Sequence, residues 1–361
     1  MKAVVVKTRQ SNLELYRCII MLLIVSCHYG LQTDLKQLAE DSQFTAPSNF
    51  YYLINMWGKI GINCFLMITG YFMCQSCITL RKFLKLYLQV VFYALVINGV
   101  FSLVGREDIS FVDWLLLLFP FRNIVSDNFS QAFIAWWLFI PFLNVLIKGM
   151  NEKMHRMLIL YSVIVFSLID FLPEIWFKIN VNPICWFSVI YIVAAYIRLY
   201  PNHIWNDSSV RFWGGMFILC LLIDVASVFS IIQISHLIGC FISPYRLIAD
   251  SNAPMALLTS VASFMFFKNL KIKHNKIINI LGSTTFGILL IHSQNSAIRL
   301  WLWKDVFDCA GHFNIPFYWA YAIGCILIVY FSCSIIDFVR INTIEKWTMI
   351  FLDNKILTKI R

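Results

Sequence analysis

The side chains of this sequence best suited to chemistry are Glu14, Arg17 and His28, which share one apolar stretch near the N-terminus. Arg17 and His28 stand 11 positions apart. On a helix this interval is about 20° beyond three full turns, so the two side chains share one face with about 16 Å between them. Glu14 stands one helical turn before Arg17, where the two can pair.

A neutral histidine is the usual general base near neutral pH, and arginine binds phosphate or carboxylate groups. The pair on one face therefore indicates an anionic group held near Arg17 and proton transfer further along the helix at His28. The alternative is that Arg17 extends to the lipid headgroups with Glu14 as its counter-ion. His28 would then lie at the membrane interface beside Tyr29.

Two further polar positions interrupt apolar stretches. Lys59 stands between Gly58 and Gly61, which permit close helix packing, so its ammonium group either reaches the lipid headgroups or meets an acceptor group. His292 opens the polar run 293–296, which is unfavourable against lipid. This run predicts either the lining of an active cavity or a structural hydrogen-bonded cluster.

The elements that must hold these residues are membrane helices. Of the 361 residues, 60% are hydrophobic and 13% are charged, whereas a soluble domain has about 25% charged residues. The mean hydropathy is +0.74. The apolar residues come in blocks of about 20, the length that crosses a bilayer as a helix, and not in the alternating pattern of a membrane barrel. The composition excludes a soluble enzyme, a disordered scaffold and a secreted disulfide module.

The predicted fold is all-α, a polytopic bundle of about ten transmembrane helices. An apolar segment at 111–121 is too short to cross the membrane and is expected to be interfacial or re-entrant. The predicted spans are 12–31, 51–74, 84–104, 132–149, 157–173, 184–200, 212–238, 254–270, 278–301 and 317–338.

The positive charges predict the orientation of the bundle. With the N-terminus in the cytoplasm, 20 lysines and arginines fall in inner segments and 6 in outer ones, while Arg17, Lys59 and Arg299 remain within spans. Cytoplasmic loops are enriched in Lys and Arg, and a missed helix would invert every later loop. Both termini are therefore expected in the cytoplasm. The net charge of +10 then marks topology and does not indicate a nucleic-acid partner.

One domain, 1–361, is expected, with cytoplasmic tails at 1–11 and 339–361. The basic N-terminus followed by an apolar run resembles a secretory signal. However, no small residues suited to cleavage follow the run, so the first helix is expected to be retained. Cys74 and Cys77 form a C-x-x-C pair without a second pair or a histidine cluster, so no metal site is predicted.

Five stretches, in order along nearly the whole chain, resemble the acyltransferase 3 family. The run Asn12-Leu13-Glu14-Leu15-Tyr16-Arg17 followed by His28 resembles its first-helix motif, an Arg and a His separated by ten residues. The later stretches are the glycine-rich block 58–72, the aromatic helix that begins at Trp136, the block Thr285–His292 and the end Asp337–Arg340.

The resemblance implies an integral membrane enzyme that moves an acetyl or other acyl group from its co-substrate, acyl-coenzyme A. The implied acceptor is a sugar hydroxyl of a bacterial surface polysaccharide or its lipid-linked precursor, and the implied location is the bacterial inner membrane. His28 is then the catalytic histidine and Arg17 its motif partner. Three positions depart from the family pattern: Thr69 replaces a Ser, Leu138-Phe139 replaces a Trp-Phe element, and Arg81-Lys82 with Lys85 replaces an Arg-x-Arg pattern.

The basic cluster Arg81, Lys82 and Lys85 lies at a predicted cytoplasmic helix start. It either marks topology and contacts headgroups, or binds the coenzyme phosphates, for which Arg offers bidentate contacts and Lys a point charge. Trp136 and Trp137 either belong to the interfacial aromatic belt or stack on the acceptor sugar.

The rival function is a membrane transporter or a polysaccharide-export protein. Glu14, Arg17 and His28 would then form an ion or proton relay. Many transporters carry internal repeats and paired broken helices, and neither is evident in this sequence.

Overall fold

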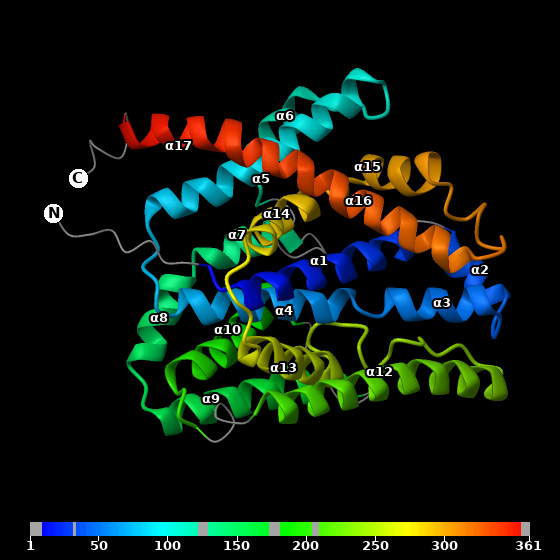
Figure 1. The fold of residues 1–361 in the computed structure, drawn as a ribbon, viewed down its shortest axis with the longest axis horizontal. Coiled ribbons are helices and arrows are strands. Elements are labelled where there is room, and N and C mark those ends of the chain that lie inside the picture. The colour runs from blue at the N-terminus through cyan, green and yellow to red at the C-terminus, as the bar shows by residue number, and fades with distance from the viewer. Residues whose placement is uncertain (1–8, 32–33, 122–128, 173–180, 204–208, 355–361) are drawn as a thin grey trace.

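The long apolar blocks fold as helices, because a helix bonds its own backbone N–H and C=O groups where no water can reach them. The computed structural model describes residues 9–31, 34–121, 129–172, 181–203 and 209–354, and within these ranges helices are the only regular secondary structure. Several long helices run along the longest axis of the molecule (Figure 1). The prediction of an all-α membrane bundle is confirmed.

The described residues form α-helices and short π-helical segments, the latter marked η. In chain order they are α1 (Ser11–Leu31), α2 (Leu35–Asp41), α3 (Ala46–Asn55), α4 (Gly58–Met73), α5 (Leu80–Leu103), α6 (Phe111–Leu117), α7 (Phe129–Trp137), α8 (Ile140–Lys148), α9 (Glu152–Val163), η1 (Ile164–Ile169), α10 (Pro183–Leu199), α12 (Val210–Ile238), α13 (Pro254–Asn269), α14 (Lys276–His292), α15 (Ser296–Leu300), η2 (Trp301–Val306), α16 (Tyr318–Arg340), η3 (Ile341–Glu345) and α17 (Lys346–Leu352).

Four helical stretches are long and apolar enough to cross a membrane by themselves: α1, α5, α12 and the run Tyr318–Leu352, which joins α16, η3 and α17. Two bent helix pairs raise the number in the described residues to six if each pair is one span. The count of ten and the cytoplasmic location of both termini stay predictions. The start of α1 and the end of α17 lie at the same end of the bundle (Figure 1), as an even number of crossings requires.

The predicted span 278–301 is not one helix. α14 ends at His292, and the chain turns by 97° into the helical segment that begins at α15. The turn falls within the polar run. The Ser293 hydroxyl donates to a carbonyl oxygen of the preceding turn, and the Asn295 side chain caps α15 by accepting one of its backbone N–H groups.

Three other segments are neither straight membrane-spanning helices nor extended tails. The predicted span 132–149 is bent by 52° between α7 and α8, where Pro141 stands in the first turn of α8. The apolar segment 111–121 contains α6, which has 7 residues, none of them buried, and is too short to cross a bilayer. The predicted C-terminal tail 339–361 continues α16 as helix to Leu352.

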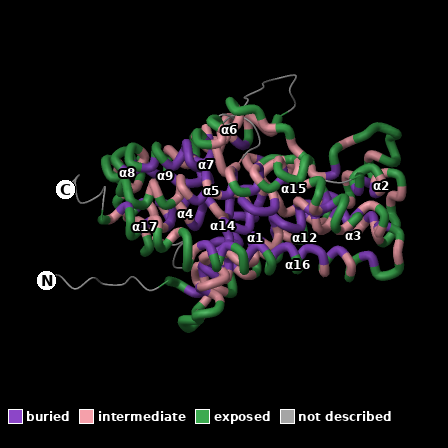
Figure 2. Tube along the Cα trace, turned by 90° about the horizontal axis from the view of Figure 1, so that it is seen from above, coloured by how far each residue is buried: buried purple, intermediate pink, exposed green. Residues whose placement is uncertain are grey.

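α1 is the central helix and packs against α3, α4, α14 and α16. Its Leu13, Met21 and Val25 are fully buried. Close approach of α4 depends on glycine, since a Cβ on Gly58 would lie 2.5 Å from the Cys27 sulfur. Buried residues concentrate along the middle of the bundle (Figure 2), so α1 carries its polar side chains into the protein interior.

A buried charge network joins α5 to α16. Arg340 Nε donates to Asp337 Oδ1 at 2.7 Å, and Arg340 Nη1 donates to Glu345 Oε2 at 2.9 Å. Lys85 Nζ lies 2.6 Å from Glu345 Oε1, and the Tyr93 hydroxyl donates to Asp337 Oδ1 at 2.8 Å. Asp337 is fully buried and Arg340 nearly so, so each charge depends on its partner.

Replacement of Arg340 tests this network. We expect Arg340→Ala to lower the free energy of unfolding by about 3–5 kcal/mol, because it leaves the Asp337 carboxylate buried without its cation. The measurement is denaturant unfolding of the purified protein in detergent. Arg106→Ala is the control, since it breaks an ion pair with Asp305 in which both side chains are about half exposed, and it should cost at most about 1 kcal/mol. Equal losses in the two variants would contradict a structural role for the network.

Candidate active site

One face of α1 lines a cavity of about 770 Å³. The other walls come from α3 and α4, the start of α7, the segment after α12, α14 and the turn into α15. Arg17 continues the same face of α1, one turn nearer the N-terminus, but it does not line the cavity. The residues of α1 in the cavity wall are Met21, Ile24, Cys27, His28 and Leu31.

Two histidines from distant parts of the chain meet at this cavity. His28 Nδ1 lies 2.8 Å from His292 Nε2, and His292 Nδ1 lies 2.6 Å from the carbonyl oxygen of Ile288. His292 is almost completely buried and does not line the cavity, whereas His28 does. His292 therefore lies behind His28 and acts on the cavity through it.

The hydrogen bonds determine where the protons lie when both rings are neutral. A carbonyl oxygen can only accept, so His292 Nδ1 carries the proton and His292 Nε2 has the lone pair. His28 Nδ1 must then donate to His292, which leaves the lone pair of His28 on Nε2. Among the described residues no group bonds to that nitrogen. His28 thus offers the cavity a proton acceptor with a fixed tautomer and ring orientation.

The same cavity has cationic side chains in its wall and no acidic ones among the described lining residues. Lys59 enters from the first turn of α4 and Arg299 from α15. Gly58 and Gly61 allow this approach, because a Cβ on Gly61 would lie 2.8 Å from the Ile24 side chain. The wall therefore suits a negatively charged group or one that becomes negative during a reaction.

At the other end of α1, Glu14 lies between two arginines. Its Oε2 is 3.2 Å from Arg9 Nη1 and 3.9 Å from Arg17 Nη1. A Cβ on Gly282 of α14 would lie 2.3 Å from this oxygen, so the glycine makes room for the carboxylate. Arg17 Nε is buried without a hydrogen-bond partner among the described residues. The predicted pairing of Glu14 with Arg17 is present, but at long range.

The predicted phosphate cluster at the start of α5 is already bonded to protein groups. Arg81 makes a bidentate pair with Asp353 at 2.8–3.2 Å, and Lys85 pairs with Glu345. Lys82 donates to a hydroxyl and a carbonyl oxygen of the preceding loop at 2.6 Å and 2.7 Å. A phosphate would therefore have to displace the two carboxylates from Arg81 and Lys85 or bind beside them.

Trp136 and Trp137, expected either in the interfacial aromatic belt or on the acceptor sugar, lie in the protein core. Both are buried and neither lines a described cavity. Trp136 donates its Nε1–H to Ser188 Oγ at 3.2 Å and packs edge-on against Tyr191, while Trp137 packs against Phe83. A ring covered by protein offers no face to a ligand, so these tryptophans belong to the core between α5, α7 and α10.

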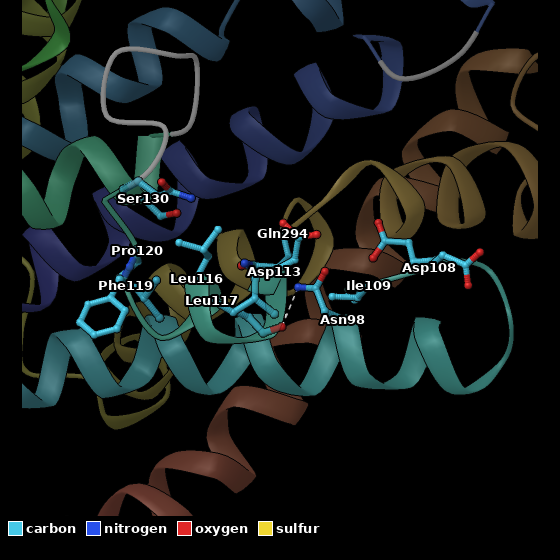
Figure 3. A pocket seen from close by; sticks show the side chains of 14 residues that line it. Asn98, Asp108, Ile109, Asp113, Leu116, Leu117, Phe119, Pro120, Ser130 and Gln294 are labelled. Carbon is cyan, nitrogen blue, oxygen red and sulfur yellow. Dashed lines mark hydrogen bonds between the residues drawn. The ribbon is translucent and has the colours of Figure 1, made fainter. Parts of the chain in front are cut away.

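A second cavity, of about 290 Å³, adjoins the first and shares Ser130 and Gln294 with it. Figure 3 shows it between α5, α6 and the turn after α14, with Asn98 and Asp113 among its polar side chains. Glu107 also lines it and accepts a hydrogen bond from Asn295 Nδ2 at 2.9 Å. Burial raises the pKa of Glu107. Carboxylates and amides predominate here, in contrast to the cationic first cavity.

Arg299, Ser130 and Gln294 are site residues that the motifs did not single out. The signal for Arg299 was its charge within a predicted span, because such residues face the protein interior. The signal for Gln294 was the polar run after His292. Ser130 gives no signal in the sequence.

A comparison with protein families assigns residues 10–337 to the acyltransferase domain of the acyltransferase 3 family. The curated proteins and the solved structures compared give no significant match. The matched residues include α1, both histidines of the cavity and Arg299. Since the match covers nearly all of the helices that build the cavity, the chain belongs to the acyltransferase 3 family and is a membrane acyltransferase.

Proposed function

We propose that this protein is an O-acyltransferase that moves an acyl group, in the first place acetyl, from acyl-coenzyme A to a sugar hydroxyl. The acceptor is a cell-surface polysaccharide or its lipid-linked precursor, and the protein works in the bacterial inner membrane. The observation that carries the proposal is the His28–His292 pair at a cavity of about 770 Å³, in which the second nitrogen of His28 bonds to no group of the described residues.

In the proposed reaction, His28 Nε2 accepts the proton of the acceptor hydroxyl as its oxygen attacks the thioester carbonyl. His292 is a positioning residue, because its hydrogen bond holds the His28 ring and favours the tautomer with the lone pair on Nε2. In an alternative route the same nitrogen attacks the thioester and forms an acyl-histidine. Incubation with radiolabelled acetyl-CoA in the absence of acceptor separates the routes, since only the second leaves label on the protein.

On the donor side, the proposal has the coenzyme enter from the cytoplasm with its phosphates near Arg17. An arm that extends along α1 from Arg17 must cover about 16 Å to reach His28. The buried, unpartnered Nε of Arg17 supports an anionic ligand at this end. Arg81 and Lys85 can contribute only if Asp353 and Glu345 release them or share them.

On the acceptor side, the second cavity supports a polyhydroxyl substrate. Carboxylates accept hydrogen bonds from hydroxyls strongly, and amides both donate and accept. The shared residues Ser130 and Gln294 make this cavity a direct neighbour of the one that holds His28. Membership of an acyltransferase family favours the enzyme over the rival transporter, and solute flux in liposomes without acyl transfer would reverse that choice.

Substitution of the two histidines tests the reaction. With radiolabelled acetyl-CoA and purified protein, we expect His28→Ala to lower the rate of acyl transfer by about 100- to 10,000-fold through loss of the general base. His292→Gln should lower kcat by less and leave KM for acetyl-CoA unchanged, because it disturbs the orientation of His28 and not binding. His236→Ala, which removes an exposed histidine of α12, is the matched control. Unchanged transfer by a folded His28→Ala protein would refute the proposed role of His28.

The acceptor site has its own test. Asp108→Asn and Asp113→Asn keep the size of the side chains but weaken their hydrogen bonds to hydroxyls. We expect them to raise KM for the acceptor several-fold and to leave KM for acetyl-CoA unchanged. Asp41→Asn, an exposed substitution on α2, serves as the control. A rise in KM for acetyl-CoA alone would place the coenzyme, and not the acceptor, in the second cavity.

A further inference from the structure

Arg299 lines the cavity because α14 ends at His292 and the chain then turns. The chain turns by 97° after His292, and Arg299 lies in the last turn of α15, the helix that follows. Its side chain lines the same cavity as His28.

Among the described residues, no hydrogen-bond acceptor meets the guanidinium group of Arg299. Its Nε is buried without a hydrogen-bond partner among the described residues, and no described carboxylate pairs with Arg299 or lines the cavity. By contrast, Arg340 and Arg81 each bond to carboxylates. Arg299 is half-buried and its Nε is fully buried. Burying a hydrogen-bond donor without an acceptor costs free energy, so we expect the acceptor to come from a ligand in the cavity.

We propose that Arg299 binds the carbonyl oxygen of the acyl donor and stabilises the oxyanion that forms on it. This role rests on the proposed acyl transfer. The planar guanidinium offers several N–H donors in a rigid fork. Donors that are aimed in advance at a developing oxyanion, in a site that excludes water, give one of the largest contributions to catalysis.

The proposed acyl transfer takes place in two stages. The acceptor oxygen forms a bond to the thioester carbon, its proton passes to His28 Nε2, and the carbonyl π electrons move to the oxygen beside Arg299. The tetrahedral centre then reforms the carbonyl and breaks the carbon–sulfur bond, and the thiolate takes the proton from His28. The products are the sugar ester and free coenzyme A, and the charge beside Arg299 exists only between the stages.

Variants at position 299 test the proposal on the full-length protein in detergent. We expect Arg299→Gln and Arg299→Ala to lower kcat about 100- to 1,000-fold, while KM for acetyl-CoA and for the acceptor stays within about threefold. Added guanidinium ion should restore part of the activity of Arg299→Ala and none to His28→Ala. Arg211→Gln, an exposed substitution on α12, is the control. Arg299→Lys keeps the charge, so it remains informative if the smaller variants do not fold, and it should retain partial activity.

Other outcomes overturn this role. If Arg299→Gln raises KM for the acceptor or the donor and leaves kcat unchanged, Arg299 binds an anionic group of that substrate in the ground state. If all variants keep full activity, or guanidinium does not rescue a folded Arg299→Ala protein, the oxyanion role is wrong. A failure of the proposed function can be told apart from a failure of the Arg299 role, because the wild-type protein itself would then transfer no acyl group.

Discussion

The structure depends on one constraint: polar groups carried into an apolar bundle must find their partners within it. The hydrogen bond between His28 and His292 meets this constraint at one end of the α1–α14 contact. At the other end, Glu14 packs against Gly282. These two contacts fix the register of α1 against α14, so a shift along either helix would leave an imidazole or a carboxylate without its place. The central position of α1 is thus set by its polar residues as much as by its apolar ones.

The cavity follows from the same constraint and from two local features, the glycines of α4 and the polar run after His292. Gly58 and Gly61 bring α4 close to α1 and introduce Lys59 at the level of His28. α14 ends directly after His292, and the chain turns by 97° into the segment that begins with α15, whose Arg299 lines the cavity. The turn at the polar run therefore helps to shape the cavity and brings Arg299 into its wall.

Helix periodicity explains what could be predicted from the sequence. The period of 3.6 residues places Arg17 and His28 on one face of α1. This follows from their spacing alone, whichever helices surround α1. The partner of His28 could not be read in this way, because the pairing with His292 joins segments far apart in the chain. The burial of Trp136 was missed for the same reason, since aromatic residues serve both in membrane interfaces and in cores. The turn before Arg299 depends on two side-chain caps, which hydropathy does not detect.

In the proposed reaction, acyl-coenzyme A and the sugar would make opposite electrostatic demands, and the two cavities differ in charge in the corresponding way. The coenzyme is polyanionic, so its phosphates are repelled by Glu107, Asp108 and the other acid of the second cavity. A sugar is neutral there and gains hydrogen bonds from the same carboxylates. In the first cavity, Arg299 is the cation that we propose stabilises the charge on the thioester oxygen. Only the uncharged acyl end of the donor needs to enter it, because the anionic part can remain near Arg17. Under the proposed function, this division of charge would keep the two substrates apart except where the thioester and the hydroxyl meet at His28.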